Sequence, residues 1–89
     1  MRHTVPGVIF MAYEHLRALR EDRDVKQRQL AELLHVHQTT YSEYELGKTN
    51  IPPASLCILA DFYQTSVDYL LDRTDVTQPY PKKRQGELR

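Results

Sequence analysis

The sequence has too few cysteines for a disulfide framework and no surplus of either charge. Its 89 residues contain a single cysteine, so a core of apolar side chains has to stabilise the one small domain that this length allows. Twelve basic residues balance twelve acidic ones, which leaves no overall positive field to indicate a nucleic-acid partner. Residues 73–89 hold five basic and two acidic residues, and residues 1–72 hold seven basic and ten acidic ones. The body of the domain is thus mildly acidic.

Long apolar runs are also missing. The run at residues 8–12 is too short to span a bilayer, and no small-residue cleavage pattern follows it. We therefore expect no membrane association and a cytoplasmic protein, and the unpaired Cys57 fits a reducing compartment.

The residue patterns of an active site are absent as well. We find no glycine-rich loop for phosphate and no carboxylate pair placed for acid–base work. We expect Cys57 to be a buried or half-buried helix residue, because no paired base indicates a nucleophile. His35 and His37 have no further ligand at metal-binding spacing. The sequence therefore argues against an enzyme, a metal site and a cofactor.

Helical periodicity is the main pattern that is present. Apolar residues recur three and four positions apart, which is the period of helices buried on one face: Leu16, Leu19, Leu30, Ala31, Leu34, Leu56, Leu59, Ala60, Tyr63, Val67 and Leu70. The breaks between them predict five helices, roughly at residues 8–22, 27–34, 38–46, 54–63 and 66–72. We expect an all-α fold.

Composition divides the chain into three parts. We expect a partly helical N-terminal extension at 1–13, a folded domain at 14–73 and a flexible basic tail at 74–89. Pro53 suits the first turn of the fourth helix, and Ser66 can cap the fifth beside Asp68. The basic residues 82–84 are either a solvated end or a sequence-independent phosphate contact.

Residues 27–46 are predicted to form a helix, a short turn and a second helix. Ala31 is small enough for two helices to cross closely, and Val36 can plug the turn from inside. Tyr41 and Tyr44 can anchor the second helix in the core, and we expect their hydroxyls to reach the surface. The remaining positions share the opposite face of this helix: Gln38, Thr39, Ser42 and Glu43.

Short polar side chains at the start of an exposed helix are what a helix-turn-helix presents to base edges. Gln pairs with adenine, Ser and Thr contact several bases, and Glu accepts from the cytosine amino group. Glu43 is thus compatible with base reading, although its charge repels phosphate.

Five motifs follow one another along the chain: Leu16-x-x-Leu19-Arg20, Gln27-x-x-Leu30-Ala31-x-x-Leu34-x-Val36, Tyr41-Ser42-x-Tyr44-Glu45-x-Gly47-Lys48-x-Asn50, Leu59-Ala60 and Ser66-Val67-Asp68-Tyr69-Leu70-Leu71. In this combination the sequence resembles the Cro/phage-repressor (XRE-like) helix-turn-helix family over roughly residues 14–73. The resemblance implies a compact five-helix, lambda-repressor-like DNA-binding domain.

The resemblance also implies roles for single residues. Positions that usually touch bases are Gln38, Thr39 and Glu43, with Ser42 beside them. Positions that usually touch the DNA backbone are Gln27, His37, Thr40, Lys48 and Asn50. Arg20 and Glu45 match a largely buried ion pair that ties the first helix to the third.

Three residues depart from the family pattern. His35 stands where glycine is usual, so we expect a positive φ there. Lys26 replaces a Ser or Thr cap, so Asp24 or solvent would have to satisfy the first N–H groups of the second helix. Glu43 replaces a residue that is often polar or basic.

The fourth and fifth helices carry more apolar residues than one core requires: Ile51, Cys57, Ile58, Phe62, Tyr69 and Leu71. We expect the N-terminal extension, with Val8, Ile9 and Phe10, to cover some of them. The others indicate a partner surface, and a homodimer is the default because two-fold operators need two recognition helices.

Two functions remain open at this point. The first is a sequence-specific transcriptional regulator, expected to be a repressor, that reads double-stranded DNA with helix 38–46 as a dimer. The second is a protein-interaction module of the same fold, such as an antirepressor or the antitoxin of a toxin–antitoxin pair. The acidic body and Glu43 slightly favour the second. The regulator is nevertheless the leading hypothesis, because base contact best explains the Gln-Thr-Thr at the start of an exposed helix.

Overall fold

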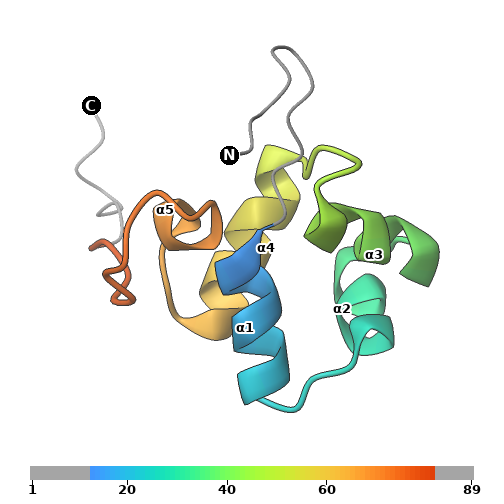
Figure 1. Cartoon of the computed structure of the whole chain (residues 1–89), viewed down its shortest axis with the longest axis horizontal. Helices are drawn as coiled ribbons and strands as arrows, with labels where there is room; N and C mark the ends of the chain where they lie inside the picture. Colours follow the sequence, from blue (N-terminus) through green and yellow to red (C-terminus); the bar gives the residue numbers. More distant parts are fainter. Residues whose placement is uncertain (1–12, 82–89) are drawn as a thin grey trace, which may run out of the picture.

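Five α-helices make up the regular structure of residues 13–81, the part of the chain that the computed structural model describes. They are α1 (Glu14–Asp22), α2 (Gln27–Leu34), α3 (Gln38–Leu46), α4 (Pro53–Tyr63) and α5 (Val67–Leu70). In Figure 1, α2 and α3 form one side of the molecule and α5 the other, with α1 and α4 between them. These residues contain no strand, so the predicted all-α fold is confirmed.

The helix bounds differ from the predicted ones at three places. α1 begins at Glu14, because Tyr13 has an extended backbone with φ −74° and ψ 92°. The predicted start at residue 8, and with it Val8, Ile9 and Phe10, lies outside the described residues. α4 begins one residue early, at Pro53. α5 spans only Val67–Leu70, since Asp72 turns into the left-handed region at φ 63°.

Three helices end in the same way, with one residue in the left-handed region. These residues are His35 (φ 59°), Gly47 (φ 75°) and Gln64 (φ 58°), which end α2, α3 and α4. The next N–H then reaches back to a free carbonyl of the helix, as Val36 does to Ala31 at 2.9 Å. The positive φ predicted for His35 is present, and it costs roughly 1–2 kcal/mol in a residue that has a Cβ.

The start of α2 is capped in a way that the sequence analysis did not predict. The Gln29 side chain accepts from the Lys26 backbone N–H at 2.8 Å, so a residue within the helix fixes the chain at the cap position. The Lys26 ammonium cannot accept a hydrogen bond, and the reciprocal half of a capping box is therefore missing. At α5 the predicted cap is present, because Ser66 Oγ accepts from the Tyr69 N–H at 3.0 Å.

The core lies where the helices meet, and most of the residues predicted for it are buried. Its members are Tyr13, Leu16, Leu30, Ala31, Leu34, Tyr41, Tyr44, Ile51, Leu59, Ala60, Tyr63 and Leu70. Leu19, Leu56 and Val67 were expected there and are half-buried against it. The burial predicted for Cys57 is wrong, because Leu56, Leu59 and Ala60 fill the inner face of α4 and leave the cysteine outside.

Two tyrosine hydroxyls are buried at the centre of the core. Those of Tyr41 and Tyr63 have no hydrogen-bond partner among the described residues. The expectation that the Tyr41 hydroxyl reaches the surface is therefore wrong; its ring is enclosed beside Glu45. Burial, and then the charge of Glu45, raises the pKa of both hydroxyls, and that of Tyr63 reaches about 12.

The start of α1 is capped by a residue from the other end of the domain. Asp72 accepts from the backbone N–H groups of Glu14 and His15, both at 2.9 Å. The His15 ring stacks on Tyr69 with centroids 3.9 Å apart, and its Nδ1 donates to the Tyr69 carbonyl at 2.7 Å. α1 and α5 are thus clasped by side chain and backbone together.

Residues 74–81 return to the body of the domain. The Thr65 hydroxyl donates to the Thr77 carbonyl at 2.6 Å, and the Tyr80 hydroxyl donates to Asp68 at 2.7 Å. Residues 82–89 lie outside the described part, so a flexible basic tail at 74–89 stays a prediction. None of the helices in residues 13–81 has the length and apolarity needed to cross a membrane.

The Asp72 cap predicts a measurable loss of stability in Asp72→Asn. Asn tolerates the left-handed backbone but supplies one acceptor and no charge, so we expect a loss of about 1 kcal/mol. Urea unfolding followed by circular dichroism measures it. Asp75→Asn is the matched control, because it removes the same charge from a fully exposed side chain 3.6 Å from His15. Equal losses in the two variants would contradict the capping role.

The buried hydroxyls predict a loss of stability at high pH. Because folding raises the pKa of Tyr63 to about 12, stability is unaffected well below pH 10 and falls as the pH rises from about 10 towards 12. Between pH 10 and 12, we expect Tyr63→Phe to reduce the slope of the unfolding free energy against pH by up to about 1.4 kcal/mol per pH unit. At neutral pH it should be nearly neutral, because the hydroxyl lacks a partner. Urea unfolding at several pH values tests this, and an unchanged slope would contradict it.

Candidate nucleic-acid interface

The helix pair α2 and α3 builds the exposed surface that the sequence analysis singled out. Ala31 is 2% exposed where the helices approach each other, and Val36 is half-buried against the core in the turn. His37 is extended, with φ −70° and ψ 152°, and α3 starts directly after it. The turn therefore points the first residues of α3 away from the core.

Three of the four residues expected to read bases lie beside Gln27. Gln38 and Thr39 are exposed in the first turn of α3, and Ser42 is half-buried one turn later. Together with Gln27 they line a shallow hollow of about 330 Å³. The structure thus gathers amide and hydroxyl groups, which can donate as well as accept, on one surface of the helix pair.

Glu43, the fourth expected base reader, is held apart from this hollow. The Thr49 hydroxyl donates to Glu43 Oε1 at 3.1 Å, across the turn that follows α3. Sequence reasoning missed Thr49. Gly47 could have indicated this contact, because a left-handed residue at a helix end turns the following residues back along the helix.

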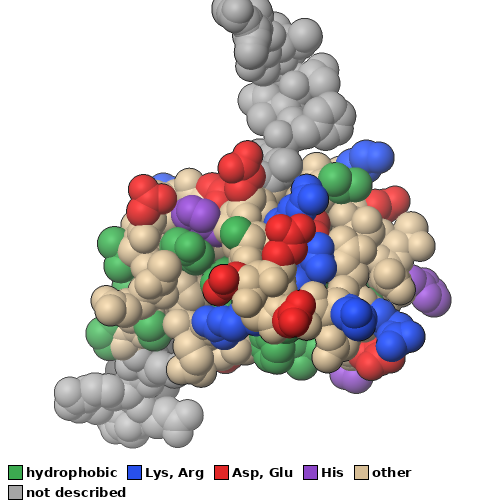
Figure 2. Space-filling model, turned by 60° about the horizontal axis from the view of Figure 1, so that its bottom comes forward, with side chains coloured by type: hydrophobic (Ala, Val, Ile, Leu, Met, Phe, Trp, Pro, Cys, Tyr) green, Lys and Arg blue, Asp and Glu red, His purple; other side chains and the backbone are tan. Residues whose placement is uncertain are grey.

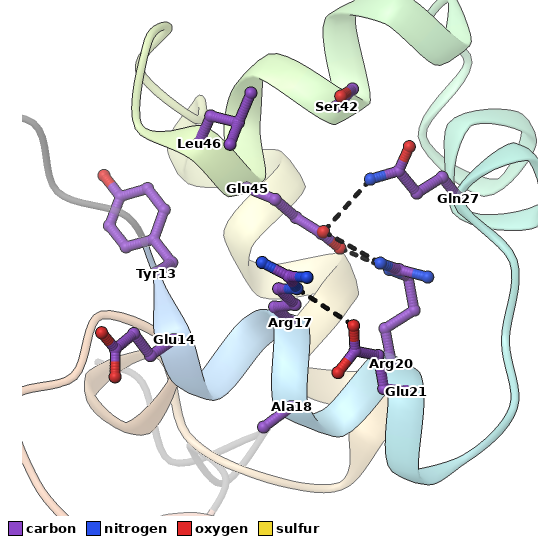
Figure 3. A pocket seen from close by; sticks show the side chains of 10 residues that line it. All are labelled: Tyr13, Glu14, Arg17, Ala18, Arg20, Glu21, Gln27, Ser42, Glu45 and Leu46. Atoms are coloured by element: carbon purple, nitrogen blue, oxygen red, sulfur yellow. Dashed lines mark hydrogen bonds and ion pairs between the residues drawn. The ribbon is translucent and has the colours of Figure 1, made fainter.

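An ion pair lies directly behind the exposed surface. Arg20 Nε donates to Glu45 Oε2 at 2.6 Å and a terminal guanidinium nitrogen donates to Oε1 at 3.2 Å, and Gln27 Nε2 reaches Oε1 at 3.2 Å (Figure 3). The Arg20 and Glu45 side chains are 15% and 4% exposed. The hydrogen bond to Glu45 raises the pKa of Arg20 above its usual value. One carboxylate thereby joins α1, α2 and α3.

A second hollow of about 530 Å³ opens between α1 and α3 in front of this ion pair (Figure 3). Arg17 and Glu21 on α1 and Leu46 on α3 line it, and Gln27 and Ser42 belong to both hollows. Several of its polar groups already pair with one another, as Arg17 does with Glu21 at 3.0 Å.

Four of the five residues expected to contact the DNA backbone lie near the two ends of α3, and the fifth, Gln27, begins α2. His37 is exposed immediately before the helix, and Thr40 is half-buried in its first turn. Lys48 and Asn50 are exposed after its end. They lie on either side of the positions that the sequence analysis predicted to read bases.

Charge on this molecule is mixed. In Figure 2, acidic and basic side chains are interspersed over the face shown, without a broad area of one sign. α3 carries two carboxylates, and Arg20 compensates that of Glu45. Within the described part of the chain, Glu43 is therefore the carboxylate of α3 that has no cation paired with it. Among residues 13–81, no group of three or more His, Cys, Asp or Glu side chains is arranged to hold a metal ion.

These features define the class: two helices joined by a tight turn, the second of them exposed along a polar edge and braced from behind, form a helix-turn-helix DNA-binding domain. The profile of the helix-turn-helix family matches residues 16–70. The chain belongs to the Cro/C1-type helix-turn-helix family of transcriptional regulators, a non-enzymatic class.

Three relatives support the membership. The uncharacterized HTH-type transcriptional regulator YobD of Bacillus subtilis (strain 168) is 37% identical over 89% of this chain and 69% of its own length. The HTH-type transcriptional regulator AnsR of the same organism is 32% identical over 81% of this chain and 62% of its own length. The HTH-type transcriptional activator BcrR of Enterococcus faecalis is 38% identical over 65% of this chain, but this match spans only 28% of BcrR.

A solved structure has the same fold. The crystal structure of a transcriptional regulator from Listeria innocua superposes with a TM-score of 0.66 at 26% sequence identity, over 90% of this chain and 68% of that one. The predicted family and fold are therefore confirmed.

The buried ion pair predicts a large effect of Arg20→Met on stability. The substitution leaves Glu45 buried without its cation, and we expect a loss of about 3–5 kcal/mol in urea unfolding. The double variant R20M/E45M should recover most of the loss, because no unpaired charge remains. Arg17→Met is the control: this exposed pair with Glu21 should contribute less than about 1 kcal/mol. A small effect of Arg20→Met alone would contradict the bracing role.

Proposed function

We propose that this chain is a dimeric, sequence-specific DNA-binding regulator that inserts α3 into the major groove. The observation that carries the proposal is the common surface of Gln38, Thr39 and Ser42, exposed at the N-terminal half of α3 beside Gln27. Side chains of this size and polarity can reach base edges, and none of the three belongs to the core that the described residues form.

In this proposal the residues divide into two groups by what they touch. Gln38, Thr39, Ser42 and Glu43 contact base edges. Gln27, His37, Thr40, Lys48 and Asn50 contact phosphates and fix the register of α3 in the groove. The amide nitrogen of Gln27 already donates one hydrogen bond to Glu45. A phosphate contact therefore requires its second N–H, or a rotation of the amide group.

A strip on α4 supports dimerisation. We call Cys57, Ile58 and Phe62 the α4 strip; all three are exposed, Ile58 at 40% and Phe62 at 45%. The other surplus apolar residues are less exposed: Ile51 belongs to the core, and Tyr69 and Leu71 are half-buried. A second copy that buries the α4 strip would present two copies of α3 to a two-fold operator.

Repression is the mode of action that we propose, on the resemblance to phage repressors. The relatives above include regulators and one activator, so the direction has to be measured. An operator placed over a promoter in a transcription assay decides it: a repressor lowers transcript yield as its concentration rises.

The α4 strip also supports the second candidate, a protein-interaction module. Both candidates are tested by incubating the purified protein with a pool of random DNA duplexes near physiological salt and sequencing what is retained. Enrichment of a two-fold symmetric site, with half-sites about one helical turn apart, supports the dimeric regulator. Retention without a common sequence, lost uniformly as salt rises, supports the interaction module.

The division of roles predicts different effects of Gln38→Ala and Lys48→Ala on DNA binding. Gln38→Ala should cost about 1–3 kcal/mol on the selected site and relax the preference at one base pair. Lys48→Ala should weaken all duplexes alike and reduce the slope of log K against log salt by about one. Fluorescence anisotropy titrations at several salt concentrations measure both. The same effect of both substitutions on every sequence would contradict the assignment.

A further inference from the structure

The turn after α3 brings Thr49 alongside Glu43. Gly47 is left-handed at φ 75°, and the Lys48 N–H then donates to the Glu43 carbonyl at 3.0 Å. This closes the end of α3 and folds the next residue back over the last turn of the helix. The Thr49 hydroxyl donates to Glu43 Oε1 at 3.1 Å as a result.

The chemistry of this contact fixes which atoms remain available. An ionised carboxylate only accepts, so the proton of the bond comes from the Thr49 hydroxyl. Glu43 is half-buried, and within the described residues no other hydrogen bond or ion pair is recorded for its carboxylate. Oε1 is thus engaged with the turn, while Oε2 stays free to accept from a ligand.

We propose that Thr49 is a positioning residue for sequence recognition: it holds the Glu43 carboxylate so that Oε2 accepts from the exocyclic amino group of a cytosine. The inference rests on the proposed function, since it needs α3 in the major groove. It names a base pair that the operator contains, and it adds a residue from outside α3 to the specificity of the site.

Cytosine is favoured by the donors and acceptors that each base presents. Its N4 amino group is a donor at the major-groove edge, whereas guanine offers the acceptors O6 and N7, and thymine offers the acceptor O4. Adenine has a donor at N6, but its N7 acceptor lies beside it and repels a carboxylate. A carboxylate held in one orientation cannot rotate to avoid these acceptors, and it therefore disfavours the other three bases.

The neighbouring charges leave Glu43 free for this role. The other carboxylate of α3, Glu45, is committed to Arg20 at 2.6 Å. The Lys48 backbone N–H donates to the Glu43 carbonyl, but among the residues that the structure describes the side chains of these two residues form no ion pair. The contact to Glu43 that the structure does show is the Thr49 hydroxyl.

The test is the random-duplex selection, carried out with the full chain and three variants: Thr49→Val, Thr49→Ser and Glu43→Gln. Thr49→Val keeps the shape of the side chain and removes the donor, whereas Thr49→Ser keeps the donor. Glu43→Gln identifies the base pair, because its preference should move from cytosine towards adenine. Thermal unfolding of each variant establishes that it folds.

At the base pair that Glu43→Gln identifies, we expect the parent chain and Thr49→Ser to select cytosine. Thr49→Val should lower the discrimination against the other bases at this pair by about fivefold, which is the scale of one net hydrogen bond. Preferences at all other base pairs should stay unchanged. A folded Thr49→Val with this profile supports the inference.

Three outcomes would overturn it, and they are distinguishable. If the parent chain selects no site, the proposed function fails and the inference fails with it. If the parent chain selects a site and Thr49→Val keeps the full preference for cytosine, Thr49 does not position Glu43, and the proposed function stands. If Thr49→Val and Thr49→Ser weaken all sequences equally, Thr49 acts on the backbone or on the fold.

Discussion

The pairing of Arg20 with Glu45 is the interaction on which the arrangement of the helices depends. Glu45 is 5% exposed, and a charge this deep is tolerated only where its partners satisfy it. Arg20 provides two donors from α1, and Gln27 provides a third from α2. Arg20 also donates to the Val25 carbonyl at 3.2 Å, which holds the loop before α2. A hydrophobic contact would tolerate sliding, whereas these bonds fix how α3 is rotated about its own axis.

α3 accordingly divides its residues between two tasks. Its inner face, with Tyr41, Tyr44 and Glu45, belongs to the core and to the ion pair. Its outer face keeps no apolar side chain until Leu46, which is 46% exposed at the end of the helix. The polarity of the outer face contributes little to folding. It is the part of the helix that is open to a ligand, and its position is determined by the core residues and the ion pair behind it.

Most of the fold was predictable because helix ends and buried faces leave local signals. The leucine spacing, Gly47, Pro53 and Ser66 indicated where helices α2 to α5 lie. Contacts between distant residues leave no such signal: nothing local predicts that Asp72 caps α1, or that Tyr41 is enclosed with its hydroxyl. For the candidate site, helical period was enough to group Gln38, Thr39 and Ser42. It could not find Thr49, whose place depends on the turn at Gly47.

The Asp72 cap has a consequence for how the domain comes apart. α1 has no side-chain cap of its own, and the bonds that close its first turn come from a residue 57 and 58 positions further along the chain. An isolated segment of nine residues is a marginal helix in water, so α1 depends for its order on contacts with the rest of the domain, among them this cap from the far end of the sequence. Fraying at α5 that displaces Asp72 therefore also loosens the start of α1, which couples the two ends of the folded chain.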